Sequence, residues 1–308
     1  MAALDLCVIF NPKAGRQRAA RRLEQLRRGW GTHADFWPTR GPGDAEQLAG
    51  QAADAGFRIV AAAGGDGTVH EVANGLLRAA RPEVRFGVVP IGSANDYAHS
   101  LGIDSNGQPP AELVRSVDVG IVREPGGRER YFVCCLGLGL NGAVTLESRR
   151  IHRLQGIALY GLATLRPLWY RYATPNMEIS MDGQPPTSIP TLMLSVMLGR
   201  REGGFVLAPN AKLDDGLFDF LHAGALSRWE VLRFLPHVAL WGPPTNHPKV
   251  RLGQCRTIRL RSEAPLTVHL DGEFFAVPED HIRELEIQIL PRLLRVQTSL
   301  QTGELTSR

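Results

Sequence analysis

Short apolar runs alternate with helical segments through the first third of the chain, and this order limits the possible folds more than any other feature. The runs that read as strands are LDLCVIF (4–10), HADFWPT (33–39), FRIVAAAGG (57–65) and VRFGVVPIG (84–92). The segments that read as helices lie between them, at 16–29, 43–56 and 68–80. Short connections between alternating strands and helices favour parallel pairing, so the sequence predicts an α/β domain with a parallel sheet.

The pattern changes after Ser116, where strand-like segments become dominant. The segment EPGGRER (124–130) separates two apolar runs and is typical of a hairpin connection, because glycine supplies the positive φ that such turns need. Two helical segments, around 147–171 and 227–240, interrupt the later strands. We therefore expect a second, mainly antiparallel β domain that begins near residue 120.

The composition fits two ordinary domains. The 308 residues are 44% hydrophobic and 21% charged, which is enough apolar material for two packed cores. No stretch approaches the roughly 18 uninterrupted apolar residues of a membrane span, and the N-terminal residues lack the pattern of a signal peptide. The four cysteines have neither metal-ligand nor disulfide-framework spacing, which favours a reducing compartment. A cytoplasmic protein is expected, and any contact with a membrane would be peripheral.

Arginine supplies nearly all of the positive charge. The formal net charge is +4, and the three lysines of the chain are Lys13, Lys212 and Lys249. The planar guanidinium suits phosphate groups, so binding to phosphate or to an anionic membrane surface is one explanation. Biased coding composition is the other, because bulk charge says little about function.

The segment AAAGGDGTVHE (61–71) places three glycines and an aspartate between a strand and a helix. Exposed N–H groups and the helix dipole attract phosphate at such a position, and Gly64, Gly65 and Gly67 allow close approach. Asp66 would be repelled by bare phosphate, so its presence makes better sense if Mg²⁺ lies between them. A glycine turn with Asp66 as a helix cap is the alternative. The segment lacks the lysine of a P-loop.

Two further strand ends carry turns of this kind. After the fourth strand, VVPIGSAND offers Gly92 and Ser93 for close approach, followed by the amide of Asn95 and the carboxylate of Asp96. In open α/β sheets, ligands bind beyond the carboxyl ends of the strands, where these loops fall. After the first strand, NPKAGR (11–16) adds a basic turn. An Asx-type helix start and a solvated basic turn are the respective alternatives.

Together, the motifs resemble those of the diacylglycerol kinase catalytic-domain family, which also takes in sphingosine kinases, ceramide kinases and bacterial lipid kinases. The matching segments run in order along the chain: NPKAG (11–15), GGDGT (64–68), PIGSAND (90–96), VDVG (117–120), YFVCCLGLGLNG (131–142), KLDDGLFDF (212–220) and LDGE (270–273). GGDGT alone is shared with NAD kinases and, as a near variant, with phosphofructokinases. The ordered set is far more specific.

The resemblance implies a fold of two domains. An N-terminal Rossmann-like α/β domain (1–120) would bind ATP, and a C-terminal, mainly antiparallel β-sandwich domain (121–290) would bind the lipid. The segment 291–308 is expected to pack back on the first domain. The nucleotide-binding residues that it implies are Asn11, Lys13, Gly15, Arg16, Gly64, Gly65, Gly67, Thr68, Gly92, Ser93, Asn95, Asp96 and Asp118.

The resemblance also implies catalytic roles. Asp66 would help to organise Mg·ATP, with Asp96 and Asp118 joining it in an acidic network. Glu273 matches the position that accepts the proton of the lipid hydroxyl. Phosphoryl transfer needs mainly positioning and charge neutralisation, so a base, Mg²⁺ and phosphate-facing amides are sufficient. From the residues alone, LDGEFF reads equally well as a hairpin turn with Glu273 exposed.

Three features depart from the family pattern. Ser93 stands where threonine is usual, which keeps a hydroxyl, and Cys134 and Cys135 lie in a segment that often carries asparagine. Bacterial relatives build a structural Mg²⁺ site from residues that correspond to Asp215, the carbonyl of Leu217 and an earlier acidic residue. Here that earlier residue is Lys212, whose ammonium can replace a divalent cation as the partner of Asp215. This argues against a second metal ion.

The lipid side of the chain is harder to read. Segment 149–173 mixes arginines with leucine, tyrosine and tryptophan, which suits an amphipathic element lying on anionic lipid. An ordinary helix with a basic face has the same composition. Trp229, Phe234 and Trp241 are expected in the core.

The leading functional hypothesis is an ATP- and Mg²⁺-dependent lipid kinase, which phosphorylates a hydroxyl of diacylglycerol or a sphingoid-like alcohol at a membrane surface. NAD kinase and a non-catalytic nucleotide- or lipid-binding protein on the same fold are the alternatives. No nucleic-acid partner is expected, and the oligomeric state, including a homodimer, stays open.

Overall fold

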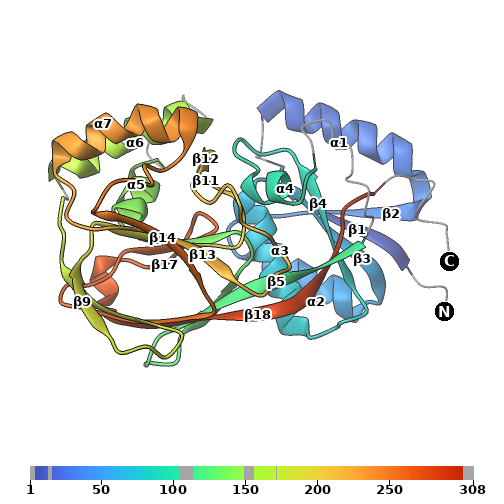
Figure 1. Ribbon diagram of the computed structural model, residues 1–308. Coiled ribbons are helices and arrows are strands. Elements are labelled where there is room, and N and C mark those ends of the chain that lie inside the picture. Colours follow the sequence, from blue (N-terminus) through green and yellow to red (C-terminus); the bar gives the residue numbers. More distant parts are fainter. Residues whose placement is uncertain (1–3, 13–15, 104–113, 149–155, 171, 301–308) are drawn as a thin grey trace. The chain divides into compact units, whose positions relative to one another are not determined.

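The computed structural model describes residues 4–12, 16–103, 114–148, 156–170 and 172–300 (Figure 1). The chain divides into two compact units, the first formed by Met1–Asp118 with Arg292–Arg308 and the second by Val119–Pro291. The strands β5 (Val114–Arg123) and β18 (Glu284–Gln297) both cross from one unit into the other.

The first unit is a layered α/β domain. Its other elements are β1 (Leu4–Phe10), α1 (Arg16–Trp30), η1 (Gly31–His33), β2 (Ala34–Pro38), α2 (Asp44–Asp54), β3 (Phe57–Gly64), α3 (Asp66–Ala79), β4 (Arg85–Pro90) and α4 (Asp96–Ser100). The strands follow the order β2-β1-β3-β4-β18, and each neighbouring pair is parallel. The prediction of a parallel sheet is therefore confirmed.

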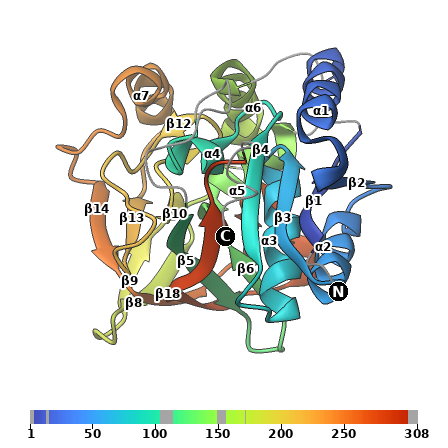
Figure 2. The same ribbon diagram turned by 90° about the vertical axis from the view of Figure 1, so that its right-hand side faces the viewer.

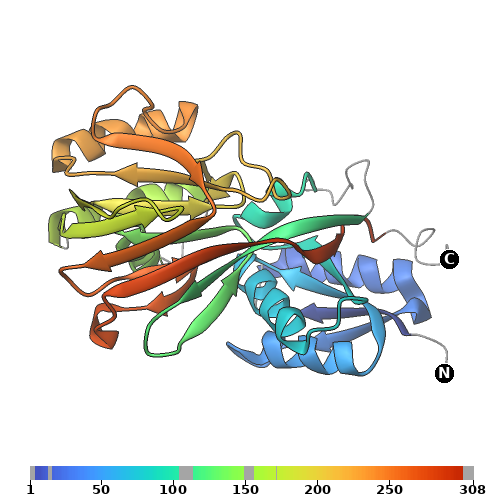
Figure 3. The ribbon, with the colours of Figure 1, turned by 60° about the horizontal axis from the view of Figure 1, so that its bottom comes forward.

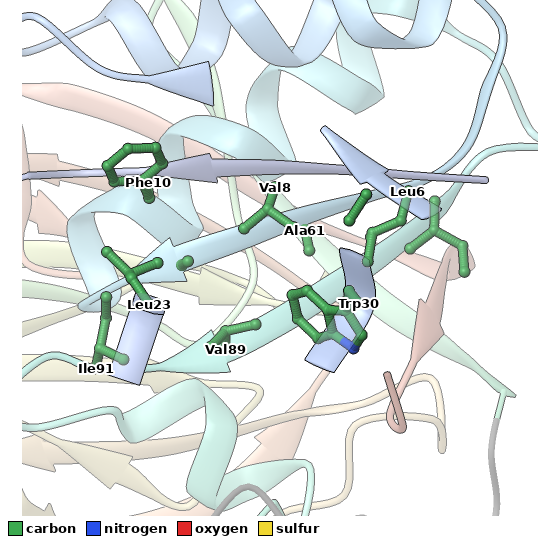
Figure 4. Close-up of a cluster of buried hydrophobic side chains, with 11 residues drawn as sticks. Leu6, Val8, Phe10, Leu23, Trp30, Ala61, Val89 and Ile91 are labelled. Atoms are coloured by element: carbon green, nitrogen blue, oxygen red, sulfur yellow. The ribbon is translucent and has the colours of Figure 1, made fainter. Parts of the chain in front are cut away.

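The inner strands of this sheet, β1, β3 and β4, are apolar along most of their length because helices cover both faces. Helix α1 lies over one face, and α2 and α3 lie over the other (Figure 1). On the α1 side, alternate strand residues form a cluster with α1 side chains, shown in Figure 4, which includes Leu6, Val8, Phe10, Leu23, Trp30, Ala61 and Val89. A sheet buried on both faces is expected to show apolar runs instead of strict alternation.

The end of β18 completes the sheet of the first unit. Val296 pairs with Phe86 of β4, and the two strands lie side by side in Figure 2. Beyond the strand, the Trp30 indole donates a hydrogen bond to the carbonyl oxygen of Leu300 (2.6 Å). Residues 292–300 are therefore built into the unit formed by the N-terminal residues.

The second unit is mainly antiparallel β structure. Its further strands are β6 (Glu129–Phe132), β7 (Cys135–Gly139), β8 (Asn176–Met181), β9 (Thr187–Pro190), β10 (Met193–Met197), β11 (Arg201–Glu202), β12 (Phe205–Val206), β13 (Phe218–Ala223), β14 (Val250–Cys255), β15 (Thr257–Ser262), β16 (Val268–Leu270) and β17 (Glu273–Ala276). Its helices are α5 (Leu140–Ser148), α6 (Gly156–Tyr170), α7 (Arg228–Trp241) and η2 (Pro278–Asp280).

Two sheets organise most of these strands (Figure 3), and β11 and β12 form a separate two-stranded sheet. One has the order β14-β13-β10-β7-β16-β17 and is antiparallel throughout. In the other, the first half of β18 pairs with β15, β15 with β8, and β8 with β9, again antiparallel. The hairpin predicted around 124–130 is confirmed, because Arg123 of β5 pairs with Glu129 of β6.

The helices of the second unit differ partly from expectation. Helix α7 confirms the segment 227–240 and is capped by Ser227, whose hydroxyl accepts from the Glu230 N–H while the Glu230 carboxylate accepts from the Ser227 N–H. The segment 147–171 holds the end of α5 and all of α6, and residues 149–155 and 171 lie outside the described part.

All four cysteines are buried, free thiols, as the absence of a disulfide framework predicted. Burial raises the pKa of Cys7 to about 12, and the nearby Asp35 adds to this. Within the part of the chain that the structure describes, no helix is both long and apolar enough to cross a membrane.

Candidate functional site

The predicted glycine turn joins β3 directly to α3. Gly65 precedes the helix in an extended conformation, and Asp66 is the first helical residue. The N-cap position is therefore held by Gly65, and the alternative that Asp66 caps the helix is wrong. A Cβ built on Gly64 would lie 2.3 Å from Oγ1 of Thr68, so the Thr68 side chain occupies the space that a larger residue would need.

Gly65 also meets the second predicted loop. A Cβ built on Gly92 would lie 2.3 Å from the Cα of Gly65, so the two loops cross backbone to backbone. The N–H groups of Ile91 and Gly92 both donate to the carbonyl of Gly64 at 3.1 Å. The structure thus brings together the two glycine loops that the sequence singled out.

The carboxylate of Asp66 lies at the start of α4. Its Oδ1 accepts a hydrogen bond from the Tyr97 N–H at 3.3 Å. Asp96, the first residue of α4, is buried. The first N–H groups of a helix have no partner within that helix, so the starts of α3 and α4 combine amide donors with the carboxylate of Asp66. This set fits a phosphate group that is bridged to Asp66 by a divalent cation.

Asn95 shapes the second loop. It has a left-handed backbone (φ 52°) just before α4, its Oδ1 accepts from the Gly92 N–H, and its Nδ2 donates to the Gly92 carbonyl, both at 3.0 Å. An asparagine tolerates this backbone region better than most residues. The amide therefore closes the turn that carries the exposed Ser93.

Asp118 lies at the end of the first unit and is fully buried. Its Oδ1 accepts a hydrogen bond from the backbone N–H of Arg292 at 2.8 Å, and Arg292 has a left-handed backbone (φ 52°). This contact ties the two chain segments of the unit together. The sequence analysis placed Asp118 in an acidic network and did not predict this structural contact with the Arg292 backbone.

The basic turn after β1 is described in part. Asn11 follows β1, and its N–H donates to the carbonyl of Ala63 (3.4 Å), next to the glycine turn. Lys13 and Gly15 lie outside the described residues, and of Arg16 the structure gives the helical backbone without the side chain. Their predicted contacts with the nucleotide stay predictions.

In the second unit, Glu273 opens β17 directly after a two-residue hairpin turn. Leu270 pairs with Glu273, and Asp271 (φ 52°) and Gly272 (φ 88°) between them both have positive φ. Asp-Gly is favoured in such turns because both central residues need positive φ. The hairpin reading of LDGEFF is confirmed, whereas Glu273 is half-buried and not exposed.

The buried carboxylate of Asp271 fixes this hairpin, a role that the sequence analysis missed. Its Oδ2 accepts from the Val133 N–H at 3.0 Å, and its Oδ1 accepts from the N–H groups of Cys134 and Cys135 at 2.8 and 3.0 Å. Three backbone donors are thereby satisfied by one side chain. The turn that carries Glu273 is held at the start of β7.

The loop before β13 holds the predicted structural metal residues. The exposed Asp215 accepts a hydrogen bond from the Leu217 N–H at 3.1 Å, across Gly216 with its φ of 74°. Burial raises the pKa of the nearby Asp219, and the charge of Asp215 adds to this. Among the described residues no group of three or more acidic, His or Cys side chains could hold a metal ion.

An apolar pocket of about 150 Å³ lies in the second unit. It is bounded by β10, β13, α5 and α7, with Met193, Leu221, Val144 and Phe234 among the side chains that line it. Few polar groups reach it, and Glu202 is one of them. Phe234, which was expected in the core, packs against the core cluster of this unit and also lines the pocket.

Trp229 and Trp241 differ from expectation. Both were predicted in the core, yet each is 72% exposed on α7. The periodicity of the helix explains the exposure of Trp229, since the pocket-lining residues recur at 231, 234, 235 and 238 and position 229 lies on the opposite side. Trp241 is the last residue of α7, and its ring contacts His237.

Comparison with known proteins identifies both parts of the chain. Residues 5–123 match the diacylglycerol kinase catalytic domain, and residues 135–298 match the YegS C-terminal NAD kinase beta sandwich-like domain. The chain is 30% identical over 279 residues to a diacylglycerol kinase of Bacillus subtilis, covering 87% of this chain and 89% of that protein. It is also 30% identical over 282 residues to "Probable lipid kinase YegS-like" of Chromohalobacter salexigens, covering 87% and 86%.

The solved structures agree on the fold. A diacylglycerol kinase structure from Bacillus anthracis superposes with a TM-score of 0.68 at 20% identity, covering 96% of this chain and 97% of that one. This likeness shows that the two chains share a fold. By its sequence matches, this chain belongs to the diacylglycerol kinase catalytic-domain family, a family of lipid kinases.

Proposed function

We propose that this protein transfers the γ-phosphoryl group of Mg·ATP to a hydroxyl of a membrane lipid, such as diacylglycerol or a sphingoid-like alcohol. The observation that carries the lipid part is the apolar pocket of the second unit. Binding a lipid chain needs an apolar cavity with few polar groups. A soluble nucleotide such as NAD would instead need polar partners for its sugars and phosphates.

The proposal that the protein binds ATP is supported by the two glycine loops of the first unit. Where Gly65 and Gly92 cross, there is no room for a side chain at Gly92, and backbone N–H groups at the start of α3 lie beside Asp66. Such a cradle would hold the phosphates, and Asp66 would hold Mg²⁺. When bound, Mg·ATP supplies the phosphoryl group and neutralises part of its charge.

Glu273 is the proposed general base. As the lipid oxygen bonds to the γ-phosphorus, the Glu273 carboxylate would take the hydroxyl proton, and the bond between that phosphorus and the bridging oxygen of ADP would break. The rigid hairpin supports this role, because Asp271 fixes the turn immediately before Glu273. A base gains from such support by staying in position for proton transfer.

The surface of α6 and α7 suits a membrane. Among the described residues, seven of the nine exposed large hydrophobic side chains lie on these helices, and they are Leu162, Leu165, Trp169, Tyr170, Trp229, Leu240 and Trp241. The helices lie side by side (Figure 1), and the rings of Trp169 and Trp229 are 6.1 Å apart. Tryptophan and tyrosine favour the interface between membrane and water.

Two further features support docking to an anionic bilayer. Arg228 lies between the aromatic rings of Trp169 and Tyr172, at 5.8 and 4.8 Å, and Arg233 is exposed on the same helix. Basic side chains beside interfacial aromatic residues bind anionic lipid headgroups. The inner side of α7 lines the apolar pocket, so one helix would contact both the bilayer and the lipid chain.

Purified protein with labelled ATP and Mg²⁺ tests the kinase proposal. Parallel reactions contain mixed-lipid vesicles with diacylglycerol and a sphingoid base, or NAD. Label in the lipid fraction supports the proposal. Label on NAD alone favours an NAD kinase, and the absence of label from both favours a non-catalytic protein; either result contradicts the proposal.

Sedimentation with vesicles tests the docking surface. Replacing Trp229 and Trp241 with serine should reduce binding to vesicles that contain anionic phospholipid, while the thermal midpoint stays unchanged because both side chains are exposed. Replacing the exposed Leu252, which lies on β14, with serine is the control. Equal binding by the tryptophan variant and the control would refute the assignment.

A further inference from the structure

A buried contact between a histidine and a carboxylate lies beside the apolar pocket. His269 on β16 is 2% exposed in its side chain and Glu202 on β11 is 11% exposed, and Nε2 of the histidine lies 3.1 Å from Oε1 of the carboxylate. The space for the imidazole comes from Gly137 on β7, where a Cβ would lie 2.3 Å from the same Nε2. Glu202 also lines the pocket, so its carboxylate belongs to both the pair and the cavity.

Each residue of this pair has a second polar atom that makes no hydrogen bond among the described residues. Among the described residues, Oε2 of Glu202 and Nδ1 of His269 have no hydrogen-bond partner, although both atoms are buried. A buried polar atom without a partner costs free energy, and most such atoms in folded proteins are paired. The second oxygen of Glu202 is thus an acceptor held beside a cavity whose walls are otherwise mainly apolar.

The register of the sheet places His269, and with it the Glu202 carboxylate that contacts it, on the sheet face that lines the pocket. His269 pairs with Gly137, Gly137 with Ser195, and Ser195 with Leu221, so these four residues form one row across the sheet. Side chains in such a row point to the same face. Leu221 lines the pocket, and Asn141, another lining residue, donates to the Ser195 hydroxyl at 2.6 Å.

We propose that Glu202 is the polar anchor of the pocket, and that it accepts a hydrogen bond from a donor group of the lipid other than the hydroxyl that is phosphorylated. This inference rests on the proposed function and names the substrate class. Lipids with a second donor near the head, which include monoacylglycerols, sphingoid bases and ceramides, provide such a hydroxyl, ammonium or amide N–H. A diacylglycerol does not, because its two esters only accept hydrogen bonds.

Kinetics with two matched lipids tests the anchor. One is a monoacylglycerol, and the other is the same molecule with its secondary hydroxyl methylated, so that the pair differs by one donor. Wild-type protein should prefer the free hydroxyl in kcat/KM by about tenfold or more, as expected for a hydrogen bond to a charged acceptor. Glu202→Leu should abolish the preference, and Glu202→Gln, which keeps an acceptor oxygen, should retain part of it.

Val144→Ala is the control within the pocket. It removes apolar contact and leaves the acceptor in place, so it should lower kcat/KM for both lipids by the same factor. A merely structural role of Glu202 would give this same uniform loss in Glu202→Leu and would overturn the proposal. An unchanged preference in Glu202→Leu would overturn it as well.

Equilibrium binding separates this inference from the kinase proposal. Calorimetric titration with a vicinal octanediol and with octyl methyl ether needs no turnover. Glu202→Leu, or Glu202→Gln if the leucine variant does not fold, should weaken binding of the diol and leave binding of the ether unchanged. If wild-type protein phosphorylates no lipid but binds the two probes in this way, the kinase proposal fails and the anchor stands. Equal effects on the two probes refute the anchor.

Discussion

Gly92 lies so close to Gly65 that a Cβ built on it would come within 2.3 Å of the Gly65 Cα. The two residues belong to different loops, and their contact has backbone on both sides, so no side-chain rotation can relieve an added methyl group. The crossing therefore fixes the distance between the loop that begins α3 and the loop that begins α4.

The first prediction concerns this crossing. Gly92→Ala should separate the loops, destabilise the protein by about 1–3 kcal/mol and weaken ATP binding, because overpacking forces the backbone to shift. Urea unfolding and nucleotide titration measure the two effects. Gly50→Ala is the matched control, since Gly50 lies within α2 with open space around it and should gain about 0.5–1 kcal/mol. Unaltered nucleotide affinity in Gly92→Ala would show that the crossing does not shape the site.

The second prediction concerns Asp66. Asp66→Asn keeps an oxygen that can accept from the Tyr97 N–H, so the fold should be retained. The loss of charge should lower phosphoryl transfer by about 10²-fold or more, as expected when a preorganised electrostatic group is removed. Asp54→Asn, at the exposed end of α2, should leave the rate unchanged. A rate for Asp66→Asn close to that of Asp54→Asn would contradict the assignment.

Glu273→Gln is the third test. A glutamine has nearly the same shape but cannot take a proton, so turnover should fall by about 10²–10⁴-fold while the thermal midpoint stays within a few degrees. Glu279→Gln, at an exposed position of η2, controls for the change of charge. Near-normal turnover of Glu273→Gln would remove this residue from the role of base.

Asp271 gives a prediction about stability. Asp271→Ala leaves three buried backbone N–H groups without their acceptor, so the free energy of unfolding should fall by about 3–5 kcal/mol. Asp271→Asn should cost less, because asparagine keeps one acceptor oxygen and tolerates the left-handed backbone of this position. Chemical denaturation ranks the two variants, and an equal loss in both would contradict the assigned hydrogen bonds.

The last prediction concerns pH. Burial lowers the pKa of His222 from 6.5 to about 4, and the nearby Arg251 adds to this. The unfolded chain therefore binds more protons than the folded one between these pH values, so stability should fall as the pH decreases from about 6.5 towards 4. His222→Gln should lose less stability over this range, because glutamine does not titrate and can still hydrogen-bond Thr191. Parallel slopes for the two proteins would contradict the assigned pKa.

Most of the parallel unit could be predicted from the sequence because its signals are local. The predicted strand at 57–65 and the observed β3 at Phe57–Gly64 differ by one residue, since a glycine turn marks the end of an apolar run. Helix α3 begins two residues earlier than predicted. Gly65 is the N-cap residue, so Asp66 and Gly67 already have helical backbone.

Contacts between residues far apart in the chain could not be predicted, because local sequence signals do not indicate them. Nothing near Asp271 indicates that its carboxylate would hold three N–H groups at 133–135, and nothing near Glu202 indicates His269 as its partner. The space that Gly137 leaves for the imidazole is likewise a product of strand register. The glycine-rich CLGLG stretch (135–139) indicates a close approach of some kind, but it does not indicate that His269 and Glu202 meet there.

The closure of the first sheet by β18 has a consequence for synthesis on the ribosome. Val296 and Gln297 are the neighbours of β4, so a nascent chain that has emerged only as far as Asp118 presents β4 as an unpaired edge. Unpaired edges invite association with other chains. The first unit therefore receives its final strand only after the entire second unit has been translated, and the β4 edge stays open to pairing with other chains during that interval.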